Sequence, residues 1–402
     1  MTPYSKQTEK SSFYDICFII SIFAMVGILL ALPYQNNRIV SLGTYVIAGC
    51  AFIMCIRYFF EHLQYVSRID ISLFALVLVC IIAMLFSHSD FKANIVSAAC
   101  FLEIPMFILC CKETKSKNPA KVFLWAQYIM SFYYLYLSRG SKAYYYKGLY
   151  GDTTIDELTL AYRNPNETSM YLFACFLSLL IAFFFYKRFI LKLMFGANAV
   201  MVFKLVWLTQ SRAGIVSCVL AIIAFVLIKI IPVNSFVTKL AIAVPWIMVA
   251  IIYFFNEKLV EINFLGSSVE TGRINVFDKV LGNLNFIKFL FGDFATHSFD
   301  NLHNVYISIF GTIGIFGVIL YSSYLSNALI SSSDKTVDNL SDKMAYLCVL
   351  LMVVYSSVEA ALFVAGSAYA MCFVGVYACF VLEDKSRYDN NEKGYDDRGY
   401  LK

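Results

Sequence analysis

The chain has 402 residues, of which 60% are hydrophobic and only 15% are charged. A soluble domain is nearer about 45–50% apolar and about 25% charged, so a water-soluble protein of this size could not bury the surplus apolar surface. The net charge of +5 is spread along the chain, and no basic block or stripe predicts nucleic-acid binding. The composition therefore predicts a membrane protein.

Apolar runs follow one another along most of the chain. A bilayer core about 30 Å thick takes roughly 20 residues of helix, and backbone groups inside lipid must pair within the helix. The sequence therefore predicts an all-α integral membrane protein with about 12 transmembrane helices, or ten if the short run and the nearly continuous last pair do not count. The predicted spans are about 13–34, 39–60, 71–87, 92–111, 120–138, 167–186, 189–209, 212–232, 237–255, 303–325, 344–361 and 364–382.

Lysines and arginines indicate the orientation, because they concentrate on the cytoplasmic side of a membrane. The short loop 112–121 holds four lysines, which places this loop and both termini inside. Two larger loops, 139–166 and 256–302, then lie outside. We predict one polytopic membrane domain, residues 1–382, followed by a polar, disordered cytoplasmic tail, residues 383–402.

The first outer loop, 139–166, is rich in tyrosine and ends in Asn164-Pro165-Asn166. Interfacial aromatic residues are usually membrane anchors, but an aromatic face with a polar tip also suits a sugar ring. The Asn-Pro-Asn triplet is expected to close the loop and cap the next span. Tyr145 and Asn166 are the candidate substrate-binding residues of this loop.

Charged residues within apolar runs are functional candidates, because a charge at the bilayer centre costs roughly 2.5–3.5 kcal/mol on insertion scales. Glu103 lies within a span and is expected either to pair with a neighbouring helix or to serve the function. Lys204 lies in the outer part of its span. It either extends to the membrane surface or contributes to a substrate site.

Two arginines are predicted to lie at helix N-termini on the outer side. Arg212 opens a span in the segment Thr-Gln-Ser-Arg-Ala-Gly at 209–214, and Arg273 follows a potential cap at Thr271. Guanidinium groups bind phosphate bidentately, and helix N-termini attract anions. The pair suggests a clamp for a diphosphate, whereas each arginine alone would equally suit an interfacial residue reaching toward water.

The loop 256–302 carries two segments with their own structure. Apolar residues at helical spacing predict a helix from Thr271 to Gly282, and a second apolar segment, Phe286–Phe291, stops at Gly292. These segments would lie along the membrane surface or fold over the bundle as a simple cap.

Three residues complete the predicted site. His303 and Asn304 stand at the closing edge of the loop, directly before a span, and a histidine can accept a proton near neutral pH. Glu359 lies in the turn before the last span and could orient a histidine or act as a base. No acidic pair of the D-x-D type lies on the outer side, so the sequence predicts neither a metal site nor a cofactor.

The order of these motifs resembles that of bacterial O-antigen polymerases and O-antigen ligases. The similarity covers about residues 164–320, and Phe277 departs from it where many relatives carry tryptophan. The resembling segments are Thr-Gln-Ser-Arg-Ala-Gly at 209–214, Gly272-Arg273, Phe-Leu-Phe-Gly at 289–292, His303-Asn304, and Gly311 with Gly-Ile-Phe-Gly at 314–317.

The resemblance implies a metal-independent glycosyltransferase of the bacterial inner membrane with a periplasmic active site. Arg212 and Arg273 would bind the diphosphate of an undecaprenyl-diphosphate-linked oligosaccharide, and His303 would activate or orient the acceptor hydroxyl. A polymerase would transfer the growing glycan to the next lipid-linked repeat unit, with a chain-length regulator as a further partner. A ligase would transfer it to the lipid A core.

We favour the polymerase, because that branch is often rich in Phe and Tyr, as this chain is. A transporter or flippase is a third alternative. Transporters of this size usually show two related halves, and we find no such internal symmetry in the sequence.

Overall fold

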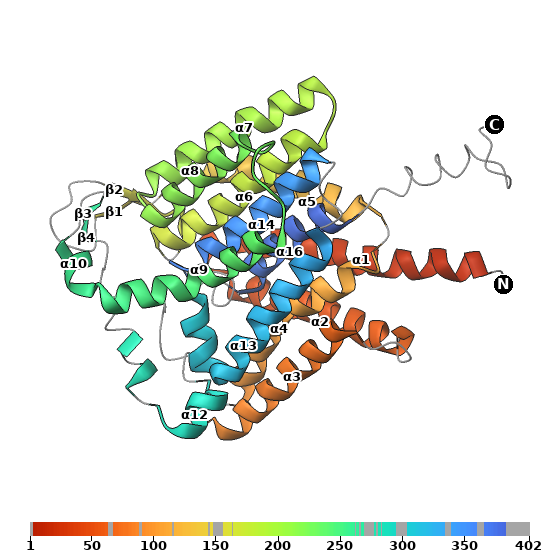
Figure 1. Ribbon diagram of the computed structural model, residues 1–402. Coiled ribbons are helices and arrows are strands. Elements are labelled where there is room, and N and C mark those ends of the chain that lie inside the picture. The colour runs from red at the N-terminus through yellow and green to blue at the C-terminus, as the bar shows by residue number, and fades with distance from the viewer. Residues whose placement is uncertain are drawn as a thin grey trace.

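The chain forms a bundle of helices with two short β-hairpins at one end (Figure 1). Among the described residues, eight helices are long and apolar enough to cross a membrane, and two shorter helices are also apolar. The prediction of an all-α membrane protein is therefore confirmed. The computed structural model describes residues 3–62, 67–87, 91–114, 116–143, 145–147, 156–162, 164–261, 263–264, 267–268, 277–278, 280–282, 284–294, 304–333, 339–359 and 366–382.

Each of the twelve predicted spans coincides with one helix. The largest boundary differences are at α1, which begins earlier than predicted, and at α13, which continues beyond the predicted end; α8 and α14 both stop before their predicted ends. The elements are α1 (Pro3–Ala31), η1 (Leu32–Tyr34), α2 (Asn37–His62), α3 (Arg68–Phe86), α4 (Phe91–Cys111), α5 (Asn118–Arg139), β1 (Tyr145–Lys147), β2 (Asp156–Leu158), α6 (Pro165–Phe185), α7 (Phe189–Leu208), α8 (Arg212–Val226), α9 (Ser235–Phe254), α10 (Asn256–Glu261), β3 (Asn263–Phe264), β4 (Ser267–Ser268), α12 (Phe286–Phe291), α13 (Val305–Ser333), α14 (Leu340–Tyr355) and α16 (Gly366–Val381).

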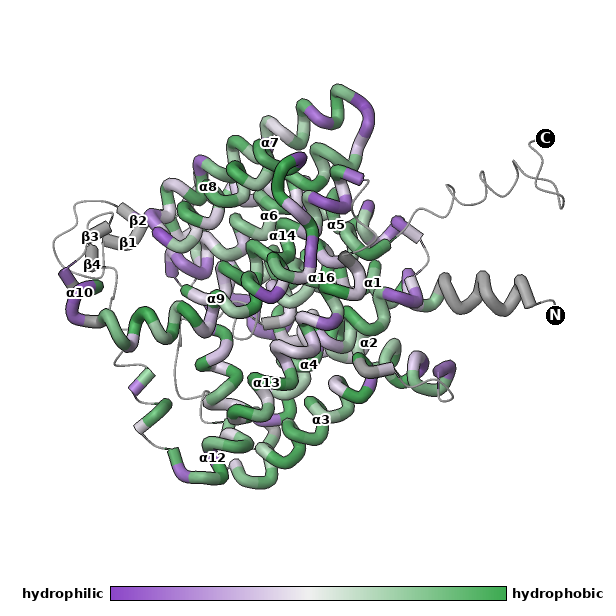
Figure 2. Tube along the Cα trace, in the orientation of Figure 1, coloured by the Kyte–Doolittle hydropathy of each residue, from purple (hydrophilic) through white to green (hydrophobic). Residues whose placement is uncertain are grey.

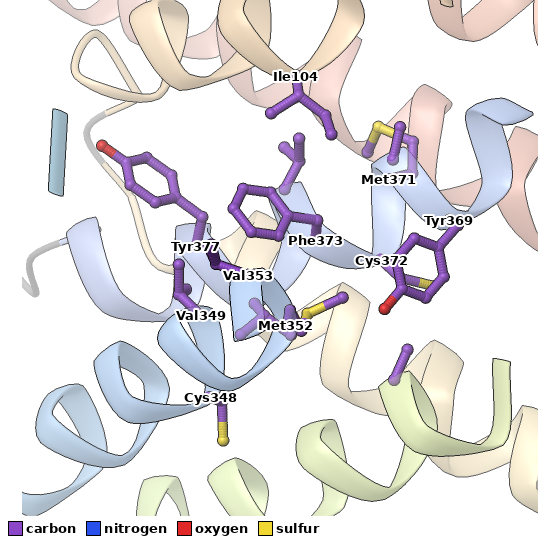
Figure 3. Packing of buried hydrophobic residues seen from close by; sticks show 14 of the residues in the cluster. Ile104, Cys348, Val349, Met352, Val353, Tyr369, Met371, Cys372, Phe373 and Tyr377 are labelled. Carbon is purple, nitrogen blue, oxygen red and sulfur yellow. The ribbon is translucent and has the colours of Figure 1, made fainter. Parts of the chain in front are cut away.

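The last helix of the chain lies at the centre of the bundle. α16 packs against α1, α4, α5, α6 and α14, and nearly all of its described side chains are buried. Figure 3 shows how it meets α14 through a set of buried side chains: Cys348, Val349, Met352 and Val353 on α14, and Tyr369, Met371, Cys372, Phe373 and Tyr377 on α16. The neighbouring helices thus pack closely around α16, which forms the centre of the hydrophobic core.

The surrounding helices consist largely of hydrophobic residues (Figure 2), and many of their apolar side chains are exposed. Exposed residues on α2, α3, α7 and α9 include Phe60, Leu85, Phe189 and Phe254, each more than 70% exposed. In water this surface would be unstable, but hydrocarbon chains solvate it. The exposed faces of these helices are therefore the lipid-facing surface of the protein.

α1 begins at one end of the bundle, and the two hairpins and α10 lie at the other (Figure 1). Because consecutive spans alternate in direction, α6, α8 and α13 all begin at the end with the hairpins. We call it the Arg212 end, after the first residue of α8.

Near the Arg212 end, α12 fits against a break in α13. The backbone of α13 leaves the helical conformation at Ile313 and at Gly314, whose φ is +67°. Phe294, just after α12, donates its N–H to the carbonyl of Thr312 (3.2 Å). The prediction that a segment at Phe286–Phe291 ends at Gly292 is confirmed.

Two glycines make this contact between α12 and α13 possible. Gly292 and Gly314 both have positive φ, a backbone conformation that residues with a Cβ atom rarely adopt. A Cβ on Gly292 would overlap the Thr312 backbone, and a Cβ on Gly314 would overlap the Leu290 backbone. Each glycine therefore makes room for the other segment.

The predicted helix from Thr271 to Gly282 lies mostly outside the described residues. Its described part is helical, with Gly282 N–H donating to the Asp278 carbonyl (2.7 Å), and Phe277 and Val280 are buried. The predicted tail 383–402 also lies outside the described residues.

We expect Gly314→Ala to lower the melting temperature of the purified protein, because the Gly314 backbone (φ +67°, ψ −170°) lies in a region that essentially only glycine adopts, and an added Cβ would overlap the Leu290 backbone. Gly49→Ala in α2 is the control, since an added Cβ there has nothing within 4 Å. Differential scanning fluorimetry in detergent measures both. Equal melting temperatures for the two variants would contradict this account of the break in α13.

Candidate functional site

Three helices begin close together at the Arg212 end, and each start is capped by a side chain. Asn164 accepts from the Glu167 N–H at the start of α6 (2.8 Å), as the sequence predicted. Ser211 accepts from the Gly214 N–H at the start of α8 (3.4 Å). Helix N-termini carry partial positive charge, so this end of the bundle favours anions.

A chain of hydroxyl groups connects two of these helix starts to the end of α14. Ser169 Oγ on α6 lies 2.9 Å from Ser211 Oγ and 3.2 Å from the hydroxyl of Tyr355, the last residue of α14, within hydrogen-bond distance of both. Gly214 allows this approach, because a Cβ there would lie 2.8 Å from Ser169 Cβ. The segment 209–214 thus combines a cap, a charge at the first helical position and a close helix contact.

The third start, that of α13, is held by the fully buried Asn304. Its Oδ1 accepts from the N–H groups of Tyr306 (2.9 Å) and Ile307 (3.3 Å). Its Nδ2 donates to the carbonyls of Pro245 in α9 (2.9 Å) and Ser357 after α14 (3.0 Å).

Those four bonds use the two donors and two acceptor positions of an asparagine amide. Asn304 therefore has no group left for a substrate. The prediction that it binds substrate is replaced by a positioning role for the start of α13.

The turn 356–359 lies between these helix starts. Within this turn, the Ser356 carbonyl accepts from the Val305 N–H (2.9 Å), and the Ser357 carbonyl accepts from Asn304 Nδ2. Glu359 ends the turn, is only 5% exposed and donates its N–H to the Tyr355 carbonyl (3.2 Å). The structure thus places Glu359 in the turn that joins α14, α13 and, through Tyr355, α6.

Arg212 is half-buried and has a carboxylate within electrostatic reach. This carboxylate is Glu157 on β2, which pairs with Tyr146 of β1 in the hairpin. Burial raises the pKa of Glu157 above its usual value, and the charge of Arg212 opposes that shift. Sequence reasoning missed Glu157, because only the pairing of β1 with β2 brings the loop back over the bundle.

The remaining predicted residues divide into two groups. Asn166 lies in the first turn of α6 and is half-buried, with its carbonyl accepting from Ser169 Oγ (3.0 Å), so it adjoins the hydroxyl chain. Lys204 is exposed on α7, on the same side as Val200 and Trp207. Lys204 therefore points away from the bundle, as expected for a lysine extending to the membrane surface, and does not join the others.

Three predicted residues cannot be placed in full. Arg273 and His303 lie outside the described residues. Tyr145 begins β1 opposite Leu158, but only its backbone is described. Within the described ranges, no group of three or more His, Cys, Asp and Glu side chains could hold a metal ion.

Comparisons of the chain with models of protein families, with curated proteins and with solved structures find no match.

We expect Glu157 to compete with anions for Arg212. Because the pKa of Glu157 is raised, falling pH neutralises it earlier than an ordinary glutamate, which should strengthen anion binding. Glu157→Gln should bind inorganic pyrophosphate up to about fivefold more tightly at neutral pH, equivalent to an ion pair of roughly 1 kcal/mol. Isothermal titration calorimetry at several pH values measures this effect.

The matched control is Glu257→Gln, which removes an exposed carboxylate from α10. Pyrophosphate itself titrates in every sample, so the informative quantity is the difference between variants. Identical pH profiles for Glu157→Gln and the wild type would show that Glu157 does not influence the anion.

Proposed function

We propose that the chain is a bacterial surface-polysaccharide polymerase of the O-antigen type. In this proposal it transfers the growing glycan from undecaprenyl diphosphate to the next lipid-linked repeat unit. The observation that carries the proposal is the position of Arg212. It occupies the first turn of α8, where the starts of α6 and α8 and the end of α14 meet through Ser169 and Tyr355.

The diphosphate is both the anchor and the leaving group of this reaction. The bond from the anomeric carbon to the diphosphate oxygen breaks, and the acceptor hydroxyl oxygen forms the new glycosidic bond. Arg212 would stabilise the negative charge that develops on the diphosphate, with Arg273 as its predicted partner. Each charge-assisted hydrogen bond is worth about 1.5–3 kcal/mol.

The acceptor hydroxyl must also lose a proton. His303 directly precedes the clamped Asn304 in the chain, and it is the first candidate to accept the proton or to orient the hydroxyl. Glu359, in the neighbouring turn, is the second candidate base or the residue that orients His303. The proposal uses no metal and no nucleotide sugar, because the lipid diphosphate already activates the donor.

The orientation is part of the same proposal. The lysine-rich loop 112–121 connects α4 to α5, and α5 ends near the Arg212 end, so this loop lies at the opposite end of the bundle. The positive-inside rule then favours cytoplasmic termini and a periplasmic Arg212 end in the inner membrane. Lipid-linked repeat units would reach the site from the outer leaflet.

We expect Arg212→Lys to lower polymer formation about ten- to a hundredfold. Lysine keeps the charge but loses the bidentate fork, and one or two lost charge-assisted bonds account for a change of this size. Arg38→Lys is the matched control, because Arg38 also lies in the first turn of a helix at this end but is exposed. Polymer length on gels of complemented cells, normalised to protein level, gives the result. Normal chains with Arg212→Lys would remove the clamp from the mechanism.

Deleting the gene separates the proposed polymerase from its alternatives. Lipopolysaccharide cores bearing a single repeat are expected for a lost polymerase. Cores without repeats, together with polymer left on the carrier lipid, would instead identify a ligase. Flipping of the lipid-linked unit by the purified protein in vesicles, without sugar transfer, would identify a flippase.

A further inference from the structure

A carboxyl group lies sealed inside the bundle, away from the Arg212 end. Glu103 on α4 is 1% exposed. It stands eight residues before the end of α4 at Cys111, about 12 Å along the helix axis. Glu103 Oε1 accepts from Ser367 Oγ in the first turn of α16 (2.7 Å), so the expected pairing with a neighbouring helix is confirmed.

The second carboxyl oxygen, Glu103 Oε2, is buried, and among the described residues it has no hydrogen-bond partner. Within the described parts of the chain, no lysine, arginine or histidine forms an ion pair with it. The segment 360–365, which leads into α16, reads Ala-Ala-Leu-Phe-Val-Ala and contains no ionisable side chain. Nothing in this segment could supply a compensating charge.

An ionised carboxylate at this place would be expensive. A charge within a membrane-spanning helix costs at least roughly 2.5–3.5 kcal/mol, and a single hydroxyl donor offsets only part of that. A proton on Oε2 removes the charge and leaves Oε1 as a carbonyl oxygen that still accepts from Ser367. The observed hydrogen bond is therefore compatible with the neutral acid.

A metal cation is a poorer occupant than a proton. Hard cations such as Ca²⁺ take about six to eight oxygen ligands. The side chains one helical turn away from Glu103 on α4 are those of Ala99, Cys100, Met106 and Phe107, and none of them carries an oxygen atom. Beyond Ser367, the polar neighbour that the structure describes is Cys100, whose Sγ lies 3.8 Å from Ser367 Oγ. Two oxygen-bearing side chains do not make a cation site.

We propose that Glu103 is a proton-binding site inside the membrane, occupied at neutral pH, which joins α4 to the start of α16 as a neutral acid. The proton is the ligand, and Ser367 is the residue that holds the carboxyl group in place. This inference concerns the interior of the bundle and is independent of the proposed glycosyl transfer.

Infrared difference spectroscopy tests the protonation state directly. The full-length wild type and Glu103→Gln are reconstituted in lipid nanodiscs, and their spectra are subtracted at pH 7. We expect a carboxylic acid C=O band that is present only in the wild type and shifts in D₂O. Glu61→Gln is the matched control, because Glu61 is ion-paired with Arg57 (2.9 Å) and should contribute carboxylate bands instead.

Carboxylate bands in the Glu103 difference spectrum would overturn the proposal. A folding failure would also be informative, because glutamine resembles the neutral acid in size and charge. If Glu103→Gln failed to fold while Glu103→Asp folded, the site would need a negative charge and the proposal would be wrong. A Glu103→Gln protein with the wild-type melting temperature supports it.

Discussion

The four hydrogen bonds of the Asn304 amide hold the Arg212 end together. They join the start of α13, a carbonyl of α9 and the turn after α14, three segments that are far apart in sequence. Backbone groups at helix ends have no partners within the helix, and lipid supplies none. One buried side chain thus satisfies groups from three segments and fixes where the start of α13 can lie.

The same requirement explains the other contacts at this end. α9 contains Pro245, which has no N–H to donate to the Ala241 carbonyl, and Tyr306 donates to the next carbonyl along α9, that of Ile242 (3.0 Å). The break in α13 exposes the Thr312 carbonyl, and the segment after α12 pairs with it. Backbone groups that have no partner in their own helix, where that helix breaks or ends, thus form hydrogen bonds to other helices. The helix starts give this end a partial positive charge, and Arg212 lies there in the first turn of α8.

The membrane environment also explains which features of the fold could be predicted from the sequence. The main helices were predictable because a helix that crosses a bilayer must be apolar and roughly 20 residues long. The end of α12 at Gly292 and the cap at Asn164 were predictable because both depend on neighbours in sequence. The break at Gly314 was not, because it exists only where α12 meets α13.

In the candidate site, too, features set by the local sequence could be predicted, whereas features that depend on distant segments could not. Arg212 at a helix start follows from local sequence, whereas the nearby Glu157 depends on the β1–β2 pairing and was missed. Asn304 was correctly placed at the start of a span, but its saturated amide depends on α9 and the turn after α14. Lys204 lies on the outward side of its helix, which hydropathy alone did not distinguish from the inward side.

The central claim is that the Arg212 end forms glycosidic bonds from a lipid diphosphate donor. The most direct measurement reconstitutes the purified protein in liposomes with an undecaprenyl-diphosphate-linked repeat unit and follows chain length and released undecaprenyl diphosphate. The account predicts a ladder of longer chains, with one carrier released for each bond formed, and a much weaker ladder for Arg212→Lys. An unchanged lipid-linked unit, with no carrier released, would contradict it.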